Sequence, residues 1–256
     1  MAAMSTLPAS VRLSLWVTAA YAGHLDIDDA LEHALPDIDH VSGAADRLRL
    51  WQDLGERVLC VALPRPGQLA TLPRGNPDLV SAATGAGECV FVPAIGGALV
   101  PDVEEFGPEG DTGTQVTWTA YDADPVPAHL LEAMDESEIE RALREHLIDA
   151  TQELDALDAK PWAGSPLRAM ADERTAMREW GLPQGLPGRA LRIIQLAGTV
   201  AAACDLALEH SPAHDVATDA RRHRVLLDLS GGAEAALAGA TTAAAQSLAG
   251  LRGTRR

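Results

Sequence analysis

The residues best suited to chemistry are five carboxylates spread over residues 102–111, where glycine and proline interrupt the chain. Carboxylate oxygens presented on turns are the ligands that Ca²⁺ and Mg²⁺ prefer. The spacing does not match the EF-hand loop, and in so acidic a chain a solvated loop explains the same residues without a ligand. We therefore assign no metal. If the first half has a site, we expect it at Asp102, Glu104, Glu105, Glu109 and Asp111.

Two aromatic residues, Trp118 and Tyr121, follow this acidic loop and are expected to form the walls of a small-molecule pocket. The loop also contains Asp111-Thr112-Gly113, the triplet of aspartic proteases. That chemistry needs two carboxylates that share one proton, each at the end of an apolar strand. Here Pro108-Glu109-Gly110 precedes the triplet and no second copy is present. These differences count against an aspartic protease. A hydrolase that uses the acidic loop is kept as an alternative hypothesis.

Two histidine clusters have the residue types of zinc or iron sites. In the first, His24 to His40, Asp26 is a good helix N-cap, which explains the acidic residues locally. In the second, Pro212 separates His210 from His214-Asp215, so a loop before a capped helix explains the pattern. We predict no cofactor. The sequence has no G-x-S-x-G, G-x-x-x-x-G-K-[ST], G-x-G-x-x-G or H-E-x-x-H motif, and whether the protein is an enzyme stays open.

The charge balance excludes several partners. The 256 residues carry 37 Asp plus Glu against 20 Lys plus Arg, a formal net charge of −17. Nucleic acid and anionic membranes both need a basic surface, so neither is an expected partner.

Residues 235–251 are uncharged but too weakly hydrophobic to span a membrane. A signal peptide could cover Arg12 to Ala22, yet a buried first helix fits better. The three cysteines show no C-x-x-C spacing, which favours buried thiols in a cytoplasmic protein.

Residues 1–127 predict a sheet-containing region of four or five short strands with helices between them. The clearest strand is Thr114 to Tyr121, in which polar and apolar residues alternate. The other expected strands are Ile38 to Val41, Arg57 to Leu63, Glu88 to Pro93 and Ala98 to Pro101. The expected helices are Val11 to Ala22, Ile27 to Ala34, Ala45 to Leu54 and Pro77 to Thr84.

The spacing of apolar residues in 128–256 predicts helices. A leucine and alanine seam, spaced by four and three residues, runs along a helix from about Glu136 to Ala159 and indicates a bundle seam or a dimer face. Further helices are expected at 167–180, at 189–210 and at 216–251, the last one interrupted by a break or kink at Ser230 to Gly232. The fold class is therefore α+β, or a small α/β layer, and the two regions could form one integrated domain.

Three stretches carry a family resemblance: RLSLWVTAAYAG from Arg12, GPEGDTGTQVTWTAYDADPVP from Gly107 and WGLPQGLPGRALR from Trp180. They resemble an uncharacterised protein family of high-GC Gram-positive bacteria. The likeness runs over most of the chain. It implies a bacterial cytosolic setting and assigns no role to any residue.

Two functions follow as hypotheses. The first is a soluble cytoplasmic module that self-associates, as a homodimer, or binds a protein partner; the apolar seam and the small-residue helix at 235–251 favour it. The second is a small-molecule-binding or divalent-metal-binding protein, or a hydrolase, that uses the acidic loop at 102–111.

Overall fold

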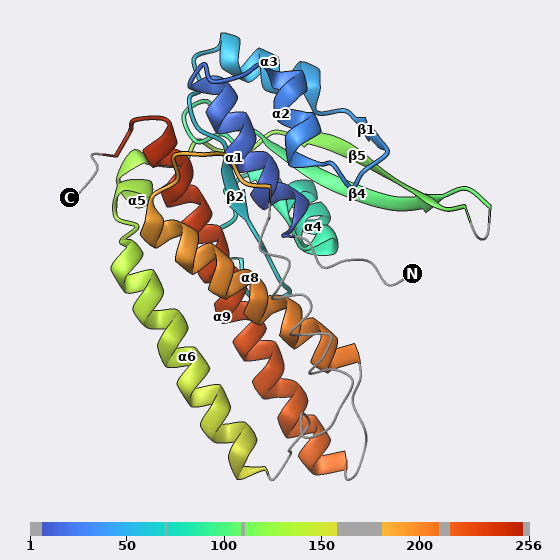
Figure 1. The fold of residues 1–256 in the computed structure, drawn as a ribbon, viewed down its shortest axis with the longest axis vertical. Helices are drawn as coiled ribbons and strands as arrows, with labels where there is room; N and C mark the ends of the chain where they lie inside the picture. Colours follow the sequence, from blue (N-terminus) through green and yellow to red (C-terminus); the bar gives the residue numbers. More distant parts are fainter. Residues whose placement is uncertain (1–6, 70, 109–110, 158–180, 210–215, 253–256) are drawn as a thin grey trace.

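The computed structural model describes residues 7–69, 71–108, 111–157, 181–209 and 216–252 and has the expected α+β fold. Its sheet has the order β1-β5-β4-β3-β2, and only β1 runs parallel to its neighbour, β5 (Figure 1). The strands are β1 (His40–Ser42), β2 (Cys60–Ala62), β3 (Cys89–Phe91), β4 (Ala98–Phe106) and β5 (Gly113–Tyr121).

Four helices lie between or before these strands, where the sequence predicts them: α1 (Ala9–Tyr21), α2 (Ile27–Ala34), α3 (Ala45–Asp53) and α4 (Pro77–Ala86). Local capping explains their starts. The Asp26 side chain accepts from the Asp29 N–H at 2.8 Å, as expected for the N-cap of α2. At α4, Asn76 accepts from the Asp78 N–H at 2.8 Å, and Pro77 occupies the first turn.

In the second half, the described residues form a short helix, α5 (Ala128–Glu132), and three long ones, α6 (Glu136–Ala156), α8 (Gly188–Glu209) and α9 (Val216–Leu248). The predicted seam on α6 packs inward: Leu143 and Ala150 are buried, and Leu147 and Leu154 pack against the same core. The seam is thus used within the chain. The helix predicted at 167–180 lies outside the described residues.

Of the break or kink predicted in the last helix, the break is wrong, because α9 continues through Ser230, Gly231 and Gly232. Side chains from other elements contact the helix closely at these glycines. A Cβ at Gly231 would clash with the Gln68 side chain, and one at Gly232 would lie 2.5 Å from His146 Nδ1. The glycines therefore serve close packing, and tertiary contacts outweigh their low helix propensity.

Two apolar cores flank the sheet. One joins the sheet to the long helices and includes Cys60 of β2, Val100 of β4 and Leu237 of α9; the other joins it to α2 and α3 through Leu31 and Trp51. Because α9 supplies much of the first core, the sheet and the helical half are packed together.

Helix α8 is long and apolar enough to cross a membrane by length and composition alone. Part of its apolar surface, including Ile193, Ile194 and Ala197, is buried in the first core, whereas Leu196 is 37% exposed.

Candidate functional site

Strands β4 and β5 extend well beyond β2 and β3 and project from the molecule (Figure 1). They pair along their whole length, from Ala98 with Tyr121 to Phe106 with Gly113. In contrast, β3 pairs with β4 only at Ala98 and Leu99. We call residues 102–106 and 113–117 the arm. Each of residues 102–106 is exposed, and no strand among the described residues pairs with the outer edge of β4 along the arm.

The sequence explains why one edge is covered and the other is open. On the β5 side, Asp39 both donates to the Thr114 carbonyl and accepts from the Thr114 N–H, each at 2.8 Å, and leads β1 into register with residues 115–117. On the β4 side, pairing with β3 ends at Leu99, and Pro101, two residues later, has no N–H to donate. Covering β5 with β1 therefore leaves β4 as the free edge.

Small and aromatic residues shape the end of the arm. The rings of His40 and Phe106 lie 5.1 Å apart. Gly113 stands opposite Phe106, and a Cβ at Gly113 would lie 2.8 Å from Phe106 Cζ. The absent side chain therefore makes room for the phenylalanine ring.

The two faces of the arm differ in chemistry. A row of valines crosses one face, with Val116 buried between Val41 and Val103, which are 37% and 50% exposed. Glu105 shares this face by strand alternation, whereas Asp102 and Glu104 project from the other. Glu104 accepts from Gln115 Nε2 at 2.9 Å. The free edge thus carries carboxylates on both faces and an exposed valine on one.

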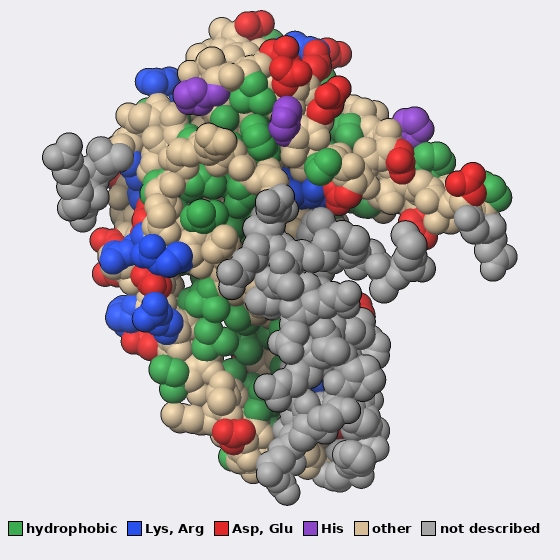
Figure 2. Space-filling model, viewed as in Figure 1, with side chains coloured by type: hydrophobic (Ala, Val, Ile, Leu, Met, Phe, Trp, Pro, Cys, Tyr) green, Lys and Arg blue, Asp and Glu red, His purple; other side chains and the backbone are tan. Residues whose placement is uncertain are grey.

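The arm has no basic residue. The sequence contains no Lys or Arg between Arg74 and Arg141. In Figure 2 the described part of the arm, at the right, shows acidic and apolar side chains and no Lys or Arg. Its carboxylates therefore create a negative field that no neighbour on the arm neutralises.

The acidic residues predicted to form a loop lie mostly on a strand, so the expectation of a loop over 102–111 is corrected. Asp102, Glu104 and Glu105 belong to β4, because pairing with β5 extends the strand to Phe106. Asp111 is exposed in the turn, at the start of the protease-like triplet, and Glu109 lies outside the described residues.

The aromatic residues expected to line a pocket are separated by the sheet. Trp118 is 2% exposed and belongs to the core with α2 and α3, whereas Tyr121 packs against the core with the long helices. Their odd spacing on a strand puts them on opposite faces. The structure therefore does not place them as two walls of one pocket with the carboxylates.

The first histidine cluster serves local structure. His33 contacts the Asp29 carbonyl at 2.7 Å and its ring lies 4.7 Å from that of Trp16. Among the residues that the structure describes, no group of three or more His, Cys, Asp and Glu side chains is arranged to hold a metal ion. His210, His214 and Asp215 lie outside those residues.

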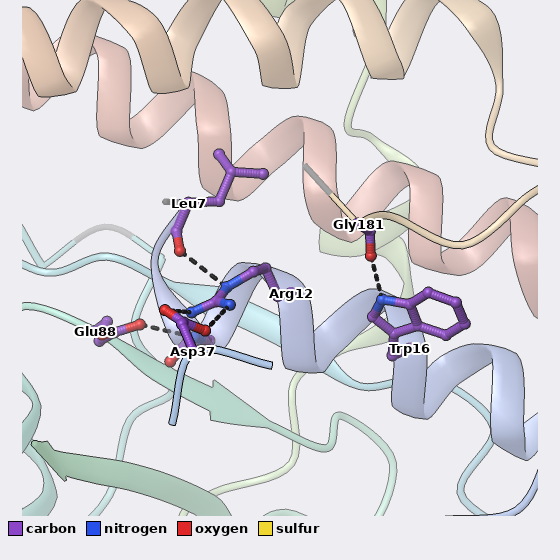
Figure 3. A network of polar contacts seen from close by, with 7 residues as sticks. Leu7, Arg12, Trp16, Asp37, Glu88 and Gly181 are labelled. Carbon is purple, nitrogen blue, oxygen red and sulfur yellow. Dashed lines mark hydrogen bonds and ion pairs between the residues drawn. The ribbon is translucent and has the colours of Figure 1, made fainter. Parts of the chain in front are cut away.

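A buried polar network, which the sequence reasoning missed, surrounds the start of α1 (Figure 3). Arg12, 5% exposed, donates to the Leu7 carbonyl at 3.1 Å and forms a two-pronged ion pair with Asp37. Glu88 accepts from the Ser10 N–H at 2.7 Å, and its burial raises its pKa. The available signal was Arg12, the one charged residue of α1. These contacts anchor α1 beside the sheet.

An open cavity of about 830 Å³ lies between α6, α9 and the segment that follows β2. Its polar lining consists of an amide, a hydroxyl, an imidazole and carboxylates: Gln68, Thr71, His146, Asp149, Glu153 and Asp228. Its described lining contains no Lys or Arg, so it is unfavourable for anionic ligands.

Comparison with known families gives two adjacent matches that together cover most of the chain. Residues 10–134 match the model described as Rv1486c-like protein, N-terminal domain, and residues 137–238 match the model for the C-terminal domain of the same proteins. The junction falls between α5 and α6. No curated protein and no solved structure matches the chain.

Proposed function

The chain belongs to the Rv1486c-like protein family, and we propose that it is a protein-interaction module whose binding element is the arm. The observation that carries this proposal is the exposed edge of β4 at residues 102–106, which has no partner strand in the described part of the chain. Such an edge presents a row of backbone donors and acceptors that another chain can satisfy.

The shape of the hairpin supports this proposal. The core needs β4 only as far as its buried residues, Ala98 to Pro101, yet the strand continues for five exposed residues. Val103 remains half exposed on this extension. An exposed strand edge with accessible apolar residues is the surface that β-strand addition uses.

We propose a partner that is a different protein. The homodimer expected from the sequence stays a prediction, but the seam on α6 and the alanine-rich part of α9 that suggested it are both packed inside the chain. The alternative of a ligand site or hydrolase at 102–111 has less support, because its strand carboxylates project from opposite faces.

We also propose a cytoplasmic setting, which the cysteines support. Cys60, Cys89 and Cys204 are free and buried, and burial raises the pKa of each thiol. Thiols held this way are unreactive, so the protein suits a reducing compartment.

Site-specific photo-crosslinking in bacterial cells tests the interaction. A photoreactive amino acid replaces Val103 on the arm or, as a control, the exposed Leu50 on α3. We expect a discrete adduct from position 103 alone, identified by mass spectrometry, and its loss in the variant Asp102→Asn/Glu104→Gln/Glu105→Gln. Equal adducts from both positions, or no adduct from position 103, would contradict the proposal. An adduct between two copies would instead identify a homodimer.

A further inference from the structure

We infer that the partner of the arm is an extended segment in which basic and apolar residues alternate, and that it adds as a new strand along residues 102–106 of β4. This inference rests on the proposed function and specifies its partner. It draws on three features of the described residues: the open backbone edge, the sign of its charge and the different chemistry of its two faces.

The backbone sets the length and conformation of the partner. In an antiparallel sheet, alternate residues of a strand turn their N–H and C=O groups toward one neighbour. On β4 the groups turned toward β5 are paired, whereas those turned away along 102–106 have no backbone partner among the described residues. Five residues of strand span about 17 Å. A partner strand of about the same length would satisfy these groups.

The side chains set the composition of the partner. Asp102 and Glu104 project from one face, and a strand laid beside them brings every second side chain close to their carboxylates. Lysine or arginine at those positions would form cross-strand pairs. On the opposite face Val103 is 50% exposed and extends the valine row, so an apolar residue there would gain burial. Glu105 on this face adds to the attraction for a basic chain.

The same charges disfavour a second copy of this chain as the occupant. In a symmetric antiparallel pairing of two β4 edges centred on Glu104, that residue faces its own counterpart, and Asp102 and Glu105 add further negative charge. Like charges directly opposite each other destabilise a strand pair. The acidic edge therefore rejects its own copy and selects a basic strand.

The test uses the full-length protein and a blocked peptide of alternating arginine and valine, about eight residues long so that it exceeds the exposed edge. The readout is amide hydrogen exchange resolved to single residues. We expect exchange at outward-facing N–H groups within 102–106 to slow about tenfold or more, and binding to weaken strongly as salt rises to about 0.5 M.

Two control peptides separate strand addition from charge attraction. A peptide of alternating glutamate and valine should not bind. Two further arginine–valine peptides keep all charges but carry backbone N-methyl groups, one on the first set of alternate residues and the other on the second set. The peptide whose methyl groups lie on the edge that pairs with β4 should no longer protect residues 102–106 from exchange. Equal protection by both methylated peptides would overturn strand addition.

Matched protein variants test the charge. Asp102→Asn/Glu104→Gln/Glu105→Gln should weaken peptide binding at least about tenfold, the change expected for several lost ionic contacts. Glu132→Gln/Glu138→Gln/Asp155→Asn makes the same charge change at exposed residues of the helical half and should bind normally. Equal weakening in both, or no protection at 102–106 in the wild type, overturns the inference. If cells give a specific adduct at position 103 but the peptide does not protect residues 102–106 from exchange, the interaction module remains supported. Only the inference of a basic partner strand is then refuted.

Discussion

Glu56 Oε1 lies 2.7 Å from the backbone N of Ile95, and the same oxygen accepts the Ala94 N–H at 2.8 Å. Glu56 is 4% exposed, and its burial raises its pKa while the two hydrogen bonds act to lower it. The contact fixes the turn between β3 and β4. A single buried carboxylate thus holds the connection from which the arm extends.

Removing this acceptor should destabilise the protein. We expect Glu56→Ala to lower the free energy of unfolding by about 2 kcal/mol, because two N–H groups lose their partner. Glu56→Gln keeps an Oε1 that can accept both bonds, and its effect should stay within about 0.5 kcal/mol at neutral pH. Urea denaturation of both variants measures the difference. Equal losses would show that the hydrogen bonds are not the cause.

The raised pKa of Glu56 predicts a pH dependence. The unfolded carboxyl titrates near its ordinary value of 4.5 and the folded one above it. Between those values the folded protein retains a proton that the unfolded chain releases, so this contribution to stability is complete below 4.5 and is lost as pH rises.

The variant Glu56→Gln has no such titration. Urea denaturation between about pH 4 and pH 7 should therefore show the wild type losing stability relative to this variant as pH rises. A constant difference across that range would contradict the assignment of the shift to Glu56.

The ion pair of Arg12 with Asp37 supplies a third prediction. Asp37→Ala leaves the buried guanidinium without its carboxylate and should cost about 2 kcal/mol, reduced from the value for a fully buried pair because the Asp37 side chain is 38% exposed. Asp46→Ala removes an exposed partner of Arg49 and should cause no measurable loss. Thermal and urea unfolding of both variants test this contrast, which fails if the two behave alike.

Gly232 on α9 gives a prediction whose sign depends on its neighbour. Gly232→Ala alone should destabilise by about 1 kcal/mol, because its Cβ would meet the His146 ring and overpack the contact between α6 and α9. In a His146→Ala background the same change should stabilise by about 1 kcal/mol through helix propensity. Chemical denaturation of the four proteins of this cycle tests the reversal. The same sign in both backgrounds would rule out the contact.

Local patterns in the sequence predicted most elements, because their causes are local. Asp26 and Asn76 cap helices by side chains within three residues, and alternation in residues 114–121 marks a half-buried strand. The α6 seam also follows from spacing alone. Whether that seam faced another copy or the same chain could not be read from it, since both choices bury the same leucines.

The predictions that were wrong concern segments whose structure depends on contacts with distant parts of the chain. The composition of residues 102–111 indicates a loop, yet pairing with β5 extends β4 through its first five residues. Gly231 and Gly232 indicate a helix break, yet Gln68 and His146 use them as contact points. Each outcome depends on which segment of the chain lies alongside, and spacing within one segment carries no information about that neighbour.

The packing of α9 against β2 sets an order of events during synthesis. Arg57 donates to the Ala249 carbonyl across 192 residues, and the Val61 N–H donates to Thr242 Oγ1 across 181. A ribosome completes β2 long before α9 emerges, so one side of the young sheet stays without its cover throughout that interval. Such late closure slows folding and leaves the apolar face of the nascent sheet exposed to aggregation until the last helix has been synthesised.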